Sequence, residues 1–270
     1  MNVYPKSDFE IKLEEELLAR AKGKSHRALS FLLAHKPLEQ LMGFCNVVSV
    51  ERYGFNDHGR VHAKIATINA LKILDLLLEA EVEPNVVKEK IGNQDDARLV
   101  TVVATFLHDL GMSIGREAHE LNSVRVGDPF IFEVLRQIYD DEGMVYVLRS
   151  YIFEAIMGHM AHMKFKSIES GVVLVSDGCD MEFGRARAAL KRKTTPAVGD
   201  IHAYSALSVS RVEILKGQSR PLEIFVRMKD NSGLFQVEET LLGKISASSI
   251  NPYIQVSVQV GDQPKMHYRI

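Results

Sequence analysis

Histidine and aspartate residues that could bind a metal ion gather in the first two thirds of this sequence. The most telling pair is His108–Asp109, which ends the uncharged run LVTVVATFL. Such a run belongs in a protein core, where an ionisable pair costs on the order of several kcal/mol unless other groups compensate it. The pair must therefore be neutralised by ordinary partners or hold a cation.

Other histidines fall at positions that point into a core. Six of the ten histidines lie between positions 58 and 162: His58, His62, His108, His119, His159 and His162. His62 shares a helix face with His58, and Asp177 follows the apolar run VVLVS. A lone core histidine is more often a hydrogen-bonded residue than a metal ligand. Here, however, four separate predicted helices each bring a histidine or an aspartate to an inward face, as a metal site inside a helical bundle requires.

The ligand types narrow the choice of metal. Neutral imidazole together with carboxylate suits Zn, Mn, Fe, Co or Ni, whereas Ca would bind oxygen ligands only. We therefore expect a cation that stabilises both an ionised Asp109 and a neutral His108.

The elements that must position these residues are mainly helices. Apolar residues recur at helical spacing, and we expect helices over residues 9–24, 25–48, 58–81, 95–109, 129–140, 144–162 and 170–193. Beyond residue 200 the pattern alternates as in strands, at SVSRVEIL, PLEIFVRM and YIQVSVQV, with a helix in SGLFQVEETLLGKISAS. We expect a mainly α fold with a helical domain over residues 1–195 and a small C-terminal α+β domain over residues 200–270.

The order and spacing of these residues resemble the HD superfamily of metal-dependent phosphohydrolases. HAKIATINAL is similar to the first-ligand helix of that family, FLHDLG to its HD segment, and VSDGCDMEFGRAR to its closing aspartate segment. The resemblance covers roughly residues 50–190, and GREAHE is similar to a stretch that follows the HD pair in prokaryotic members. It implies an HD-type helical bundle in which one metal is bound by His62, His108, Asp109 and Asp177.

The resemblance also implies further site residues. In members with two metals, two more histidines join and the HD aspartate bridges both ions, which implies His119 and His159, with His162 as a substitute for His159. The cofactor is then one or two divalent ions per chain, of Mn, Ni, Co, Zn, Mg or Fe. The expected catalytic residues are Asp109 and His58, with Glu120 as an alternative proton carrier. Residues expected to bind an anionic substrate are Arg116, His162, Lys166 and Arg185.

The implied activity is hydrolysis of a small phosphate ester, nucleotide or phosphodiester by a metal-activated water. Two alternatives stay open. Some HD proteins use similar ligands to hold two irons and activate O₂, so a di-iron oxygenase fits the same residues. The second alternative is a metal-containing regulatory or binding protein. It is supported by the segment VRMKDNSGLFQVEETLLGKI, which is similar to the strand–turn–helix of ligand-binding ACT domains.

Composition excludes other classes of protein. The chain is 46% hydrophobic and 25% charged, which is ordinary for a globular protein, and its net charge of −2 gives no reason to expect nucleic acid or a membrane as partner. No apolar run approaches the ~20 residues of a membrane span, and the acidic N-terminus is no signal peptide. Two cysteines are consistent with a reducing cytoplasm. We expect a cytoplasmic homodimer, since a second subunit can cover the edge strands.

Overall fold

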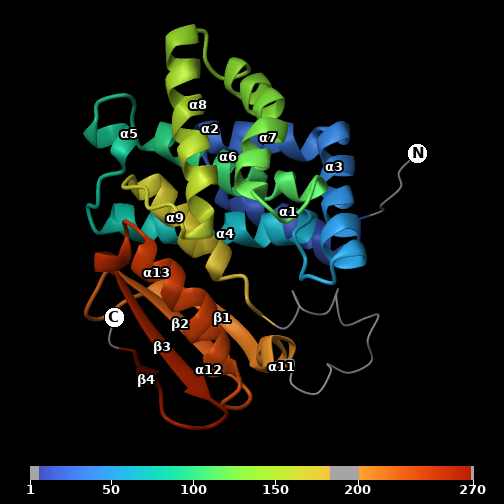
Figure 1. The fold of residues 1–270 in the computed structure, drawn as a ribbon. Coiled ribbons are helices and arrows are strands. Elements are labelled where there is room, and N and C mark those ends of the chain that lie inside the picture. The colour runs from blue at the N-terminus through green and yellow to red at the C-terminus, as the bar shows by residue number, and fades with distance from the viewer. Residues whose placement is uncertain (1–5, 183–200, 269–270) are drawn as a thin grey trace.

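The computed structural model describes residues 6–182 and 201–268. Figure 1 shows a large helical part with a small sheet packed beneath it, in orange and red. The C-terminal part contacts two helices of the large part: strands of the sheet lie against α4 (Arg60–Glu79), and the helical segments that follow the second strand lie against α9 (Ile168–Gly178). The expectation of a mainly helical chain with a small C-terminal sheet is therefore confirmed.

The helical part is built around α6 (Gln94–Leu107), which packs on α2, α4, α8 and α9. All residues from Leu99 to Leu107 are buried, as the uncharged run predicts. No helix among the described residues is both long and apolar enough to traverse a lipid bilayer. The remaining helices of this part are α1 (Asp8–Arg20), α2 (Gly23–Ala34), α3 (Lys36–Asn46), the π-helical η1 (Val47–Arg52), α5 (Asn85–Lys88), η2 (Leu110–Ser113), α7 (His119–Arg136), α8 (Glu142–Met157) and η3 (Gly158–Met160).

Several of the expected helix boundaries are wrong. The helix expected over residues 9–24 ends at Arg20, and the one expected over residues 144–162 ends at Met157. The helix expected over residues 25–48 divides at His35, whose ring accepts a hydrogen bond from the Leu38 backbone N–H at 3.3 Å, with a proline in the first turn of α3. The helix expected from residue 129 begins at His119 and carries Pro129 within it. The helix expected over residues 170–193 ends at Gly178 within the described part of the chain.

The C-terminal part contains α11 (Ile201–Ser208) and four strands in the order β1-β2-β3-β4. β1 (Val209–Lys216) pairs antiparallel with β2 (Leu222–Met228), and β3 (Ile254–Val260) pairs parallel with β2 and antiparallel with β4 (Met266–His267). A helical crossover joins β2 to β3 and consists of α12 (Gly233–Gln236), the π-helical η4 (Val237–Leu242) and α13 (Gly243–Ala247), followed by the short η5 (Asn251–Tyr253). The expected domain boundary, between residues 195 and 200, falls within residues 183–200, outside the described ranges, and stays a prediction.

An apolar cluster joins the sheet to the helices that surround the histidines. Every second residue of β2 and β3 belongs to this cluster, including Leu222, Ile224, Val226, Ile254, Val256 and Val258. The helices contribute Ile73, Leu74, Leu77, Val172 and Val175. Because α4 and α9 also carry His62 and Asp177, this cluster fixes the C-terminal part to the histidine-bearing helices.

The turn after the HD pair depends on Gly111. A Cβ atom at this position would lie 2.0 Å from the His119 carbonyl oxygen and 2.6 Å from the Ser123 backbone nitrogen. Since both atoms belong to backbone, we expect Gly111→Ala to lower the free energy of unfolding by about 3 kcal/mol, measured by urea denaturation.

Gly243→Ala is the matched control, because no atom lies within 4 Å of its added Cβ and the residue opens α13. It should leave stability unchanged or raise it by up to about 1 kcal/mol. Equal stability of the two variants would contradict the close approach of η2 to α7.

Candidate metal centre

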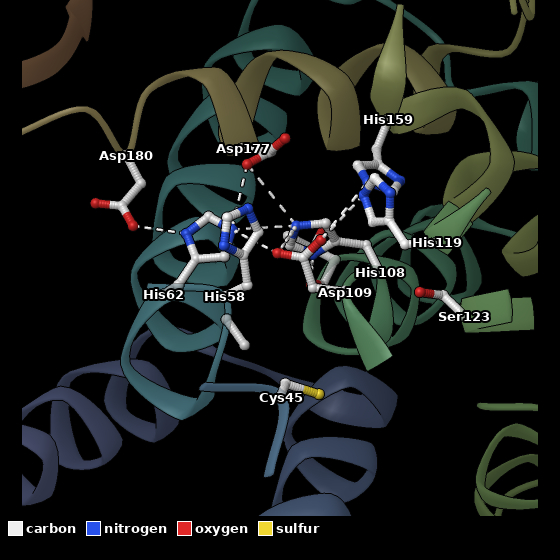
Figure 2. Close-up of polar contacts among 12 residues, drawn as sticks. Cys45, His58, His62, His108, Asp109, His119, Ser123, His159, Asp177 and Asp180 are labelled. Atoms are coloured by element: carbon white, nitrogen blue, oxygen red, sulfur yellow. Dashed lines mark hydrogen bonds and ion pairs between the residues drawn. The ribbon is translucent and has the colours of Figure 1, made fainter. Parts of the chain in front are cut away.

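Helix ends and short turns bring six histidine and aspartate side chains together (Figure 2). They come from five helices and the residue that precedes η2: His62 near the start of α4, His108 directly after α6, Asp109 before η2, His119 at the start of α7, His159 in η3 and Asp177 near the end of α9. None of these residues is more than 6% exposed. The structure thus contains a buried His/Asp cluster compatible with an HD-type metal site.

The first group of the cluster contains His62, His108, Asp109 and Asp177. The Nε2 atom of His62 lies 3.2 Å from His108 Nε2, from Asp109 Oδ2 and from Asp177 Oδ1. The Nε2 atom of His108 lies 3.3 Å from Asp109 Oδ2 and 3.8 Å from Asp177 Oδ1. The residues expected to bind one metal therefore converge on one point.

The second group contains His119, His159 and the other oxygen of Asp109. The two Nε2 atoms are 3.0 Å apart and lie 3.5 and 3.7 Å from Asp109 Oδ1. Because Oδ2 of the same carboxylate faces the first group, Asp109 links the two groups.

Hydrogen bonds at the outer side of each ring turn its Nε2 atom toward the centre of the cluster. The Nδ1–H groups donate to these acceptors: His108 to the Thr105 carbonyl at 2.6 Å, His159 to the Ile156 carbonyl at 2.6 Å, His119 to the Arg116 carbonyl at 3.0 Å, and His62 to Asp180 Oδ2 at 2.6 Å. A neutral ring that donates from Nδ1 presents a lone pair at Nε2. Lone pairs that face each other at 3.0 and 3.2 Å repel unless a cation lies between them.

One buried oxygen supports the same interpretation. Asp109 Oδ2 accepts no hydrogen bond from the described residues, although nearly all buried carboxylate oxygens do. It faces two imidazole nitrogens, and a nitrogen–oxygen ligand set of this type suits a divalent transition metal. His62, His108, Asp109 and Asp177 could hold one ion, and Asp109, His119 and His159 a second.

The two carboxylates attract positive charge into the cluster. Burial opposes ionisation of Asp109, but the charges of His108 and His58 hold its pKa well below its usual range. Burial also opposes a charge on His108, yet Asp109 and Asp177 outweigh it and raise the pKa of His108 to about 9. Burial and the His108 charge keep the pKa of His159 well below its usual range. In the metal-free chain a proton on His108 therefore balances part of the carboxylate charge, and a bound metal would replace it.

Two alanines with left-handed backbone conformation flank the second group. Ala118 (φ 50°) directly precedes His119, and Ala161 (φ 63°) follows His159 by two residues. This conformation costs a residue other than glycine about 1–2 kcal/mol. Such local strain concentrates at functional sites, where the surrounding structure maintains it.

Two residues that the sequence did not identify complete the surroundings of the cluster. Asp180 accepts the hydrogen bond from His62 Nδ1, and its position three residues after Asp177 was the available signal. Lys244 of α13 forms an ion pair with Asp177 Oδ2 and donates to the His159 carbonyl oxygen at 2.9 Å. Nothing in the sequence around Lys244 indicates this contact.

The other expected residues differ in their distance from the cluster. The ring centroid of His58 lies 6.0 Å from that of His62, and Figure 2 shows the two rings side by side. Arg116 also borders the cluster, because its Nη1 lies 3.4 Å from His119 Nε2.

The remaining expected residues lie farther out. The side chain of His162 is 53% exposed, and its Nε2 lies 3.1 Å from Glu120 Oε1, so His159 and not His162 occupies the cluster. Lys166 is exposed. Arg185 lies outside the described residues.

Asp180 orients His62, and we expect Asp180→Ala to weaken metal binding by about 10- to 100-fold, as the loss of a partner to a metal-binding histidine typically does. Asp180→Asn keeps an acceptor oxygen for His62 Nδ1–H and should lose less affinity. Titration against a chromogenic chelator measures both variants, with the exposed Asp262→Ala as control. Unchanged affinity in Asp180→Ala would contradict this role.

Comparison with known proteins identifies a relative from an archaeon. The chain is 35% identical over 229 residues to the "Uncharacterized protein MJ1020" of Methanocaldococcus jannaschii. The aligned region covers 85% of this chain and 86% of the archaeal protein. No family model and no solved structure matches the chain significantly. The chain belongs to the same family as the Methanocaldococcus jannaschii protein MJ1020.

Proposed function

We propose that this protein is a metal-dependent phosphohydrolase with an HD-type helical bundle. Its substrate is a small phosphate ester, nucleotide or phosphodiester. The observation that supports the proposal best is the position of Asp109, which directs one oxygen to each of two histidine groups. This arrangement matches the role of the HD aspartate that the resemblance implies.

The ligand set fits one or two divalent ions, which would supply an activated water and positive charge for the phosphoryl oxygens. The residues of the chain have the supporting roles. Asp109 and Asp177 stay ionised because neighbouring cations hold their pKa values well below the usual range. Nδ1 of His58 lies 2.7 Å from the Asn56 carbonyl oxygen, so a proton would be exchanged at Nε2 of this ring.

The cations at the border of the cluster favour an anionic substrate. Arg116 lies against His119, and Lys244 lies against Asp177. A guanidinium and an ammonium both bind phosphate oxygens well. Both cations lie where they could contact an anionic substrate, which favours phosphate hydrolysis over the di-iron alternative.

We expect Asp109→Ala to lose bound metal and to reduce phosphate release to background, because it removes the carboxylate shared by both groups. The measurements are metal content per chain and phosphate release from a panel of nucleotides and phosphoesters with added Mn²⁺. Circular dichroism should show nearly unchanged helical content.

Asp262→Ala is again the control, since its carboxylate is exposed on a C-terminal turn. Metal-dependent release by Asp109→Ala at the wild-type rate would overturn the site assignment. Two irons per wild-type chain without phosphate release would favour the oxygenase, and neither metal nor turnover would favour a binding protein.

A further inference from the structure

The C-terminal part places a lysine ammonium at the metal centre. α13 lies beneath α9 in Figure 1. Lys244 of α13 donates a hydrogen bond to Asp177 of α9. Asp177 directs Oδ1 toward His62 and Oδ2 toward Lys244. The Lys244 side chain is 15% exposed, so it borders the cluster without being sealed from solvent.

The backbone beside Asp177 is shaped to admit this lysine. A Cβ atom on Gly178 would lie 3.0 Å from Lys244 Cδ and 3.6 Å from Leu241 Cδ1, so a larger residue would press against the lysine side chain. The π-helical turn η4 directly precedes α13. π-helical turns are rare and frequently occur at functional sites.

An ion pair with Asp177 does not use all the hydrogen-bonding capacity of Lys244. An ammonium group has three N–H donors, and the described residues accept two of them, at Asp177 Oδ2 and the His159 carbonyl. The third donor can bind an oxygen from outside the protein.

The charged groups of the site would leave a surplus of positive charge. Two divalent ions would bring four positive charges, which the carboxylates of Asp109, Asp177 and the neighbouring Asp180 and Glu120 would offset, and the four histidines add none when they are neutral. Lys244 and Arg116 add further positive charge at the Asp177 and His119 sides of the cluster. A dianionic phosphate matches this surplus better than a diester, because it carries more charge and offers three terminal oxygens.

We propose that Lys244 is a substrate-binding residue that donates to a terminal oxygen of a phosphate monoester, so that the C-terminal part supplies specificity for dianionic phosphate. The proposal rests on the proposed phosphohydrolase function. Lys244 does not bind the metal; it binds the anion beside it.

The test measures binding of inorganic phosphate to the Mn²⁺-loaded full-length protein by calorimetry, together with the Mn²⁺ content. Lys244→Gln retains a donor for Asp177 but removes the charge. We expect unchanged Mn²⁺ content and at least about tenfold weaker phosphate binding, since a charge-assisted hydrogen bond is lost. Lys244→Arg should restore part of the affinity, and Lys216→Gln, at the exposed end of β1, should match wild type.

Turnover provides a second readout. With a substrate that the wild type hydrolyses, Lys244→Gln should raise KM for monoesters more than for diesters. Unchanged phosphate affinity in metal-loaded Lys244→Gln would overturn the proposal, and so would loss of Mn²⁺ from this variant, which would make Lys244 a positioning residue for Asp177. Absence of metal-dependent phosphate binding in the wild type would also overturn it. If phosphate binding depends on Lys244 but no ester is hydrolysed, the proposed function fails while the anion site stands.

Discussion

The buried carboxylate of Asp109 needs positive charge close to it, and this need governs the architecture of the protein. Asp109 lies in an apolar core, and an unpaired charge there would be strongly destabilising. Four imidazole rings and a second carboxylate surround it, each supplied by a different segment of the chain, and Lys244 pairs with that second carboxylate, Asp177. All six side chains of the cluster lie within the first or last three residues of a helix or in a turn next to one, and from there they converge on one place.

Part of this arrangement could be predicted from the sequence because it follows from local periodicity. The uncharged run before His108 indicates a central helix, and the structure buries every residue from Leu99 to Leu107. The alternating patterns near the C-terminus correspond to β1, β2 and β3. All six expected metal-binding side chains come together in one cluster, although whether they bind metal remains a prediction.

Other features depend on contacts that local patterns do not encode. The start of α7 at His119 follows an alanine in a left-handed conformation, which no propensity favours. His162 lies near His159 in sequence, but the turn at Ala161 points the two side chains in different directions. The exposed His162 contacts Glu120 instead. Lys244 is separated from Asp177 by 67 positions, so only the packing of α13 on α9 creates their ion pair.

The late position of Lys244 has a consequence for the synthesis of the chain. At roughly 5–20 residues per second, translation needs roughly 3 to 13 s to proceed from Asp177 to Lys244. During this interval the nascent chain already contains all six histidine and aspartate residues of the cluster, while Lys244 and the strands β3 and β4 are still to be synthesised. The order of the residues along the chain therefore places the complete His/Asp cluster before the lysine that pairs with Asp177, and before the sheet is complete.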